Sequence, residues 1–121
     1  MAQILLIEDD VVMRETLSEV LKRKGYEVVI AENGAQGLRM FREKPADLVI
    51  TDIIMPVKGG IQTIIDIQKD YPKVKIIAIS GGGLGTAEEY LTITKVLSVR
   101  HNFKKPFSNE ELLQAVKELI G

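Results

Sequence analysis

The 121-residue chain has a formal net charge of −1, with 45% hydrophobic and 27% charged residues, which is typical of a water-soluble globular domain. It has no cysteine, so disulfides, thiolate metal sites and a cysteine nucleophile are excluded. The balanced charge argues against direct nucleic-acid binding, and no apolar run approaches the roughly 20 residues of a membrane helix. We therefore expect one domain over residues 1–121, located in the cytoplasm without membrane insertion.

The first half of the chain alternates between apolar runs of strand length and amphipathic stretches of helical period. Gln3–Ile7 is predicted to be a central strand, because a continuous apolar run is typical of a strand covered on both faces. The amphipathic helix that follows is expected to direct Arg14 and its other charged side chains away from its apolar stripe. A second strand over Glu27–Ala31 precedes a helix that runs from the turn at Asn33–Gly34 to just before Pro45.

The second half of the chain repeats this alternation. Leu48–Ile50 predicts another buried strand that ends on Asp52, and Pro56 forces the chain to turn soon afterwards. The next helix is predicted to bury a stripe formed by Ile61, Ile64, Ile65 and Gln68. Lys75–Ser80 is a fourth buried strand, and we expect the glycine-rich loop Gly81–Gly85 after it to be mobile. The last predicted elements are a helix over about Ala87–Leu97, a weak strand over Val99–Phe103 and a helix opened by a capping box at Ser108.

Five repeats of a strand followed by a helix predict an α/β fold with a parallel sheet and helices on both faces. The first, third and fourth strands are the most apolar and therefore the most central. This favours a doubly wound five-stranded parallel sheet in the order 2-1-3-4-5, which is the flavodoxin-like order.

Polar groups follow the strands at the edge of the sheet where open α/β folds place their ligands. The groups expected to converge there are Glu8, Asp9 and Asp10, then Asp52, Ser80 and Lys105. Clustered acids repel each other unless a cation neutralises them, and oxygen ligands without histidine or cysteine favour Mg²⁺ or Mn²⁺. A carboxylate can act as a nucleophile toward phosphorus, and a metal and a lysine on either side suit a phosphoryl group.

In combination these motifs identify a family. The acids Glu8–Asp10, Asp52 with Met55–Pro56, Ser80–Gly81 and Lys105–Phe107 resemble the signature of response-regulator receiver domains, over the whole chain. The family has an arginine five residues after its second acid. Arg14 stands in that place, which makes Glu8 and Asp9 the acid pair and leaves Asp10 as a possible accessory.

The resemblance implies a stand-alone phosphoacceptor switch rather than an enzyme, with slow self-dephosphorylation at most. Asp52 would accept a phosphoryl group from a sensor histidine kinase or a histidine phosphotransfer protein, and an unknown downstream output protein would read the result. Ser80 and Lys105 would contact the phosphoryl group. The groups implied to hold Mg²⁺ are Asp9, Asp52, the backbone carbonyl of Ile54 and, through water, Glu8.

One position departs from the family pattern. Asn102 stands three residues before Lys105, where the family often has an aromatic switch residue. Strand alternation is expected to turn the neighbouring Phe103 to the opposite face. His101 is expected to be a surface or partner contact rather than a ligand.

Three other functions stay open from the residues alone. A receiver-like interaction domain that is not phosphorylated need not keep the acids and the lysine. A phosphatase with an aspartyl nucleophile commonly has a second acid two residues after it, where this chain has Ile54. A nucleotide-binding flavodoxin-like protein would need a phosphate-cradling loop after the first strand, where three acids stand instead.

Overall fold

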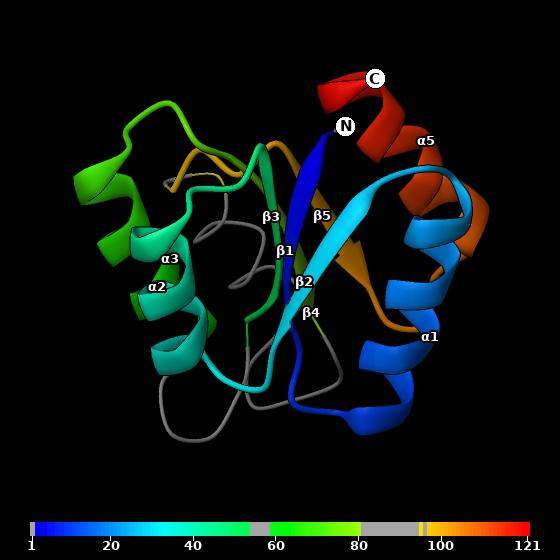
Figure 1. Cartoon of the computed structure of the whole chain (residues 1–121), viewed down its shortest axis with the longest axis horizontal. Helices are drawn as coiled ribbons and strands as arrows, with labels where there is room; N and C mark the ends of the chain where they lie inside the picture. The colour runs from blue at the N-terminus through cyan, green and yellow to red at the C-terminus, as the bar shows by residue number, and fades with distance from the viewer. Residues whose placement is uncertain (1, 54–58, 81–94, 96) are drawn as a thin grey trace.

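The computed structural model describes residues 2–53, 59–80, 95 and 97–121. Within them, a five-stranded parallel sheet has the order β2-β1-β3-β4-β5, which confirms the predicted topology (Figure 1). The strands are β1 (Gln3–Ile7), β2 (Glu27–Ala31), β3 (Leu48–Asp52), β4 (Lys75–Ser80) and β5 (His101–Lys104). The helices are α1 (Val11–Arg23), α2 (Gly34–Glu43), α3 (Gly60–Asp70) and α5 (Asn109–Ile120).

Helices cover both faces of the sheet, as predicted. α1 and α5 lie on one face and α2 and α3 on the other (Figure 1). Each face has its own apolar core: Leu6 and Ile50 belong to the cluster beside α1 and α5, and Val49 belongs to the cluster beside α2 and α3. Every residue of β1 and β3 is buried, whereas the edge strands β2 and β5 are partly exposed. The most apolar runs therefore do occupy the centre of the sheet.

Two predicted elements lie outside the described residues, entirely or almost so. They are the loop Gly81–Gly85 and the helix over about Ala87–Leu97. The weak fifth strand is real but shorter than predicted, because it begins at His101 after a turn in which Ser98 has a φ of 58°. No helix of the described part is long and apolar enough to span a bilayer.

The sequence-based prediction of two helix faces was wrong in part. Arg14 was expected to point outward, but it is only 8% exposed, because its guanidinium turns back toward the end of β1. On α3 the buried residues are Gly60, Thr63, Ile64 and Ile67, whereas Ile61, Ile65 and Gln68 are half-buried. Thr63 tolerates burial because its hydroxyl donates to the carbonyl of Gly59 at 2.9 Å.

Helix ends follow the local sequence signals. Ser108 caps α5 by accepting from the backbone N–H groups of Glu110 and Glu111, as the capping box predicts. Asn33 caps α2 in the same way by accepting from Gln36 N. Gly25 follows α1 with a φ of 94°, a left-handed conformation that favours glycine. These ends direct the chain back into the sheet.

Candidate functional site

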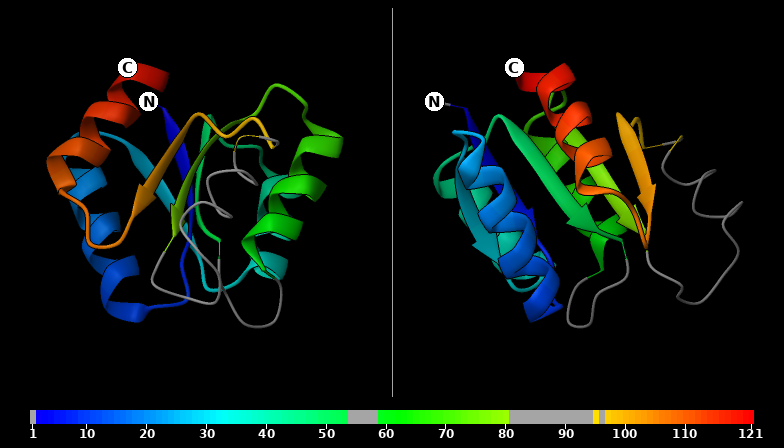
Figure 2. Two further views of the ribbon diagram at one scale, coloured as in Figure 1. Left: turned by 180° about the vertical axis from the view of Figure 1, so that it is seen from behind. Right: turned by 90° about the vertical axis from the view of Figure 1, so that its right-hand side faces the viewer.

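The carboxyl ends of the strands meet at one edge of the sheet (Figures 1 and 2). Asp52 is the last residue of β3 and is 4% exposed, and Ser80 is the last residue of β4 and is 6% exposed. Glu8 directly follows β1 and is fully buried, whereas the next residue, Asp9, is exposed. The pairing of β1 with β3 and of β3 with β4 brings these groups to adjacent positions. The sequence-predicted groups therefore do converge.

Three carboxylates form a compact acidic cluster at this edge. One oxygen from each of Glu8, Asp9 and Asp52 lies within 4.8 Å of the others. The second oxygen of Glu8, Oε2, is buried and has no hydrogen-bond partner. A buried carboxylate oxygen without a partner costs free energy, which a cation in the cluster would recover. The all-oxygen donor set is the type that Mg²⁺ or Mn²⁺ prefers.

Lys105 supplies the positive charge of the site. Its Nζ donates to Glu8 Oε1 at 2.9 Å and to Asp52 Oδ2 at 2.8 Å. The backbone N–H of Lys105 donates to the carbonyl of Ser80 at 2.8 Å, which ties the loop after β5 to the end of β4. Burial lowers the pKa of the Lys105 ammonium, but the hydrogen bonds and charges of Asp52 and Glu8 outweigh burial and leave that pKa above its usual value. Lys105 is therefore a permanent cation between the two carboxylates.

The pKa of Glu8 is unusually high for a glutamate. Burial, reinforced by the nearby charge of Asp52, raises its pKa from the usual 4.5 to about 7, although Lys105 acts in the opposite direction. The negative charge on Glu8 is therefore poorly compensated when no divalent cation is bound. The raised pKa and the buried Oε2 without a hydrogen-bond partner therefore both show that ionised Glu8 is incompletely stabilised.

Arg14 supports the acidic cluster from behind. Its Nη1 donates to the backbone carbonyl of Glu8 at 3.0 Å, and its Nη2 lies 3.9 Å from Glu32 Oε1. The buried guanidinium thus links the first turn of α1 to the segment that presents Glu8 and Asp9. From the sequence, Arg14 set the register of the acids and was expected on the outer face of the helix, so this contact was not predicted. Its place one turn into the helix after those acids is the signal that points to this contact.

Gly60 lets α3 begin against the backbone of Asp52. A Cβ atom at this position would lie 2.0 Å from the carbonyl oxygen of Asp52 and 2.7 Å from the Cα of Ile53. The N–H of Gly60 also donates to the carbonyl of Ile53 at 2.9 Å. The pair Gly59–Gly60 in the sequence does not by itself reveal this close approach, which depends on how α3 lies against the end of β3.

The remaining predicted site residues divide into three cases. Asp10 caps α1, since its Oδ1 accepts from Val12 N at 3.0 Å and Met13 N at 3.3 Å, and its carboxylate is not one of the three in the cluster. Ile54, like the motif Met55–Pro56, lies outside the described residues. Asn102 is half-buried on β5, opposite Ala78 of β4.

The neighbours of Asn102 face α5. Phe103 packs against the core beside α1 and α5, with its ring centroid 5.6 Å from that of Phe107. The His101 ring stacks on Phe103 at 6.2 Å, and its Nε2 lies 3.7 Å from Glu118 Oε2. Strand alternation therefore turns Asn102 to the face opposite the aromatic rings.

A wide cavity of about 870 Å³ lies at the other edge of the sheet, beside Phe41 and Tyr71. Two of its charged side chains, Asp47 and Lys75, are engaged within the chain. Asp47 Oδ2 accepts from Gln3 N at 2.7 Å, and Lys75 Nζ donates to Leu119 O at 2.7 Å. The convergent charged groups lie at the carboxyl edge, so we place the functional site there and not in this cavity.

Known proteins are similar to this chain in both sequence and fold. Residues 4–117 match the response regulator receiver domain. The chain is 32% identical to the chemotaxis protein CheY of Bacillus subtilis, over 98% of each chain. It is 34% identical to the transcriptional regulatory protein GlrR of Escherichia coli over 98% of this chain, but it spans only 26% of that protein's length.

Solved structures agree with the sequence relatives. A response regulator receiver domain protein from Clostridium thermocellum superposes with a TM-score of 0.90 at 28% identity, covering 99% of this chain and 94% of that one. The chemotaxis protein CheY4 of Vibrio cholerae gives a TM-score of 0.86 at 27% identity, over 99% of each chain. Sequence, topology and the position of the acidic cluster lead to one assignment: the chain belongs to the response regulator receiver domain family.

Proposed function

We propose that this receiver domain accepts a phosphoryl group on Asp52 and changes its binding to a partner in response. The observation that carries the proposal is the position of the Asp52 carboxylate, buried at the end of β3, 2.8 Å from Lys105 Nζ and within the cluster that includes Glu8 and Asp9. Receiver domains typically serve as phosphoacceptor switches, so the family assignment supports the same conclusion.

In the proposed transfer an oxygen of the Asp52 carboxylate attacks the phosphorus of a phosphohistidine on the donor protein. A P–O bond forms as the P–N bond breaks, and the electron pair of the broken bond stays on the imidazole nitrogen. The Lys105 ammonium, which already contacts Asp52, then pairs with an oxygen of the transferred group. Ser80, at the end of the neighbouring strand, donates its hydroxyl hydrogen to another.

The acidic cluster fits Mg²⁺ or Mn²⁺, given its oxygen donors and the unpartnered Oε2 of Glu8. Asp9 and Asp52 would hold the cation directly, and Glu8 would act through water. The backbone carbonyl of Ile54 completes the set by resemblance to the family. When bound, the cation supplies positive charge that neutralises the phosphoryl oxygens and allows two anions to approach each other.

The proposed donor is a sensor histidine kinase or a histidine phosphotransfer protein, and a downstream output protein or output domain reads the phosphorylated state. The proposed location, given such partners, is the cytoplasm. The domain acts as a substrate and switch, and hydrolysis of its own acyl phosphate is a slow side reaction in which Lys105 assists.

The test is labelling by a small phosphodonor such as acetyl phosphate in the presence of Mg²⁺, followed by intact-protein mass spectrometry. Asp52→Asn is expected to abolish the added phosphoryl group. Asp10→Asn is the matched control, since Asp10 caps α1 and asparagine caps equally well. Undiminished labelling of Asp52→Asn would overturn the acceptor assignment.

Two further measurements separate the alternatives. Calorimetry that detects no Mg²⁺ binding would favour an interaction domain that is not phosphorylated. Multiple turnover of a small phosphomonoester would favour a phosphatase with an aspartyl nucleophile.

A further inference from the structure

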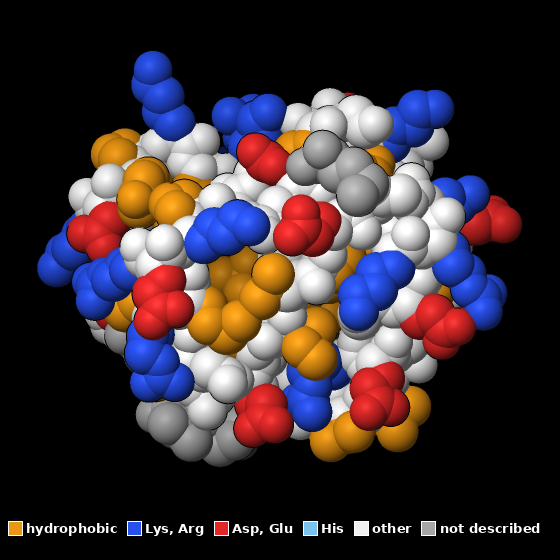
Figure 3. All heavy atoms as spheres, viewed as in Figure 1, with side chains coloured by type: hydrophobic (Ala, Val, Ile, Leu, Met, Phe, Trp, Pro, Cys, Tyr) orange, Lys and Arg blue, Asp and Glu red, His pale blue; other side chains and the backbone are white. Residues whose placement is uncertain are grey.

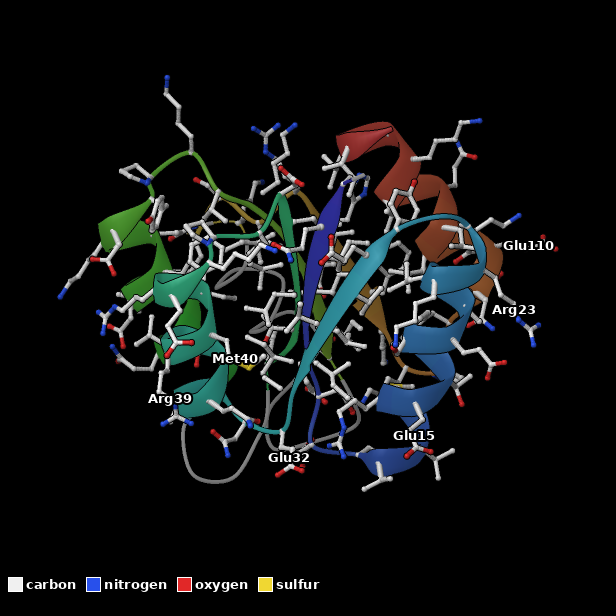
Figure 4. All side chains as sticks on the ribbon, in the orientation of Figure 1. Glu15, Arg23, Glu32, Arg39, Met40 and Glu110 are labelled. Atoms are coloured by element: carbon white, nitrogen blue, oxygen red, sulfur yellow. The ribbon has the colours of Figure 1, made fainter. Side chains whose placement is uncertain are left out.

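Thr51 is a fully buried polar residue in β3, the central strand of the sheet, directly before Asp52. Charged side chains lie on the outside of the molecule: Figure 3 shows lysine, arginine and acidic side chains spread over this face, and in Figure 4 Arg23 and Arg39 lie at the outer margins of α1 and α2. A buried hydroxyl is the more informative observation, because valine would fill the same shape without the cost of burying a polar group.

The side chain of Thr51 lies in apolar surroundings, away from the reacting carboxylate. By strand register Thr51 is opposite Ile7 of β1 and Ala78 of β4. Side chains alternate along β3, so Thr51 faces α2 and α3, as Val49 does, whereas the side chain of Asp52 points to the other face. An effect of Thr51 on Asp52 must therefore act through the backbone.

The hydroxyl of Thr51 holds the peptide group that follows Asp52. Thr51 Oγ1 donates to Asp52 O at 3.0 Å, and the N–H of the same peptide group, on Ile53, donates to Ile79 O of β4 at 2.9 Å. Both polar atoms of this peptide group are therefore engaged. Gly60 packs beside it, since a Cβ there would lie 2.9 Å from the carbonyl carbon of Asp52. The orientation of this peptide plane fixes ψ at Asp52 and, with it, the direction in which the carboxylate leaves the backbone.

We infer that Thr51 is a positioning residue for the acceptor, whose hydroxyl keeps the Asp52 carboxylate directed into the site at the carboxyl edge of the sheet. This inference rests on the proposed phosphoacceptor role of Asp52. A carboxylate that attacks phosphorus loses rate when its direction varies, because orientation of the reacting groups supplies a large part of the rate of such a transfer. Without the hydroxyl, the carbonyl of Asp52 loses a hydrogen bond that opposes rotation of the peptide plane.

Thr51→Val tests this role, because valine has the shape of threonine, lacks the hydroxyl and suits a strand. The rate of labelling by acetyl phosphate at saturating Mg²⁺ is expected to fall by about fivefold or more, since a small misdirection of a nucleophile is costly in rate. Thr51→Ser keeps the hydroxyl donor and is expected to retain at least about half of the unmodified rate. Recovery with serine assigns the effect to the hydroxyl and not to the methyl group.

Thr63→Val is the matched control. Thr63 is also fully buried, and its hydroxyl donates to the carbonyl of Gly59 at 2.9 Å, so the substitution removes the same kind of hydrogen bond. The two valine variants are expected to shift the midpoint of urea unfolding by similar amounts, and Thr51→Val alone is expected to slow labelling. Equal labelling rates for the two valine variants, or a Thr51→Ser variant as slow as Thr51→Val, would overturn the positioning role.

Asp52→Asn separates this inference from the proposed function. If the unmodified chain gains a phosphoryl group and Asp52→Asn does not, the acceptor is identified and the threonine variants decide the role of Thr51 alone. A label that persists in Asp52→Asn, or an unmodified chain that takes no label, would overturn the acceptor proposal and the positioning role together.

Discussion

The electrostatics of the site depend mainly on Glu8, a buried carboxylate whose negative charge is only partly balanced by neighbouring groups. Glu8 is fully buried, one of its oxygens has no hydrogen-bond partner, and its pKa is raised to about 7. Lys105 offsets part of this cost through contacts with Glu8 and Asp52. A divalent cation in the proposed site would relieve the remaining cost, which is measurable in the protein without a cation.

The first prediction concerns Glu8→Gln in the absence of divalent cations. The folded-state pKa is raised from 4.5 to about 7, so the folded state binds the proton more tightly than the unfolded state does. The stability contributed by protonated Glu8 is complete below about pH 4.5 and is lost as the pH rises through about 7. The unfolding free energy of the unmodified protein should therefore fall, relative to Glu8→Gln, by about 1–3 kcal/mol between pH 5 and pH 8.

Urea titrations of both proteins across this pH range measure that difference. Using the difference between the two proteins removes the contributions of the other titrating groups. A difference that does not change with pH would contradict the raised pKa.

The second prediction concerns Arg14→Met. The substitution removes the hydrogen bond from the guanidinium to the buried carbonyl of Glu8, so we expect a loss of about 1–3 kcal/mol in the free energy of unfolding, together with weaker Mg²⁺ binding. Arg23→Met is the matched control on the same helix. Its side chain is 76% exposed and pairs with Glu19 on the surface, so it should cost less than about 0.5 kcal/mol. Equal losses in denaturant titrations would show that the buried contact of Arg14 is not important.

At the scale of single elements, helix starts position the site. Asp10 follows the acid pair in sequence and caps α1, so its carboxylate is used by the helix. A carboxylate oxygen of the exposed Asp9 lies in the acidic cluster instead. α3 begins with Gly59 as its N-cap and no side-chain capping bond. Its first residue, Gly60, lies against the backbone of Asp52. Among the described helices, the starts of α1 and α3 therefore lie directly beside the residues that carry the carboxylates.

The third prediction compares two adjacent glycines at the start of α3. Gly60→Ala places a Cβ 2.0 Å from the Asp52 carbonyl oxygen, so the helix or the strand end must shift, at a cost of about 3 kcal/mol and with slower labelling of Asp52. Gly59→Ala meets its nearest atom, the carbonyl oxygen of Ile53, at 3.9 Å and should cost about 1 kcal/mol or less. Thermal unfolding and acetyl phosphate labelling of both variants test the contrast, and similar behaviour would rule out the close approach.

At the scale of the whole molecule, the parallel sheet brings together residues that are far apart in sequence. Lys105 contacts Glu8, 97 residues away, and Asp52, 53 residues away. Such contacts exist only when the sheet is complete, so a ligand that binds the cluster binds the folded state alone. Cation binding must therefore stabilise the entire domain.

The fourth prediction follows from this linkage. Mg²⁺ at about 100 times its dissociation constant should raise the free energy of unfolding by about 2.7 kcal/mol. Asp9→Asn should remove most of this gain and leave the fold intact, because Asp9 is exposed. Thermal unfolding with and without Mg²⁺ measures both effects. An equal Mg²⁺ effect in Asp9→Asn would mean that Asp9 is not a ligand.

By itself the sequence determined the alternation of strands and helices, the strand order and the segments that carry the polar groups. The physical reason is that apolar runs and helical periods report burial locally, and strands buried on both faces must be central. For the same reason the ends of β1, β3 and β4 were recognisable as polar groups after apolar runs.

Only the tertiary structure decided which of these groups touch and how helices are rotated against the sheet. Arg14 turned inward because the backbone carbonyl of Glu8, directly after β1, lies within its reach, and Gly60 is required because the backbone at the end of β3 passes beside it. The paired contacts of Lys105 and the raised pKa of Glu8 likewise depend on distances across the sheet. Such distances are set by strand register and by packing between remote segments, which no local pattern of residues encodes.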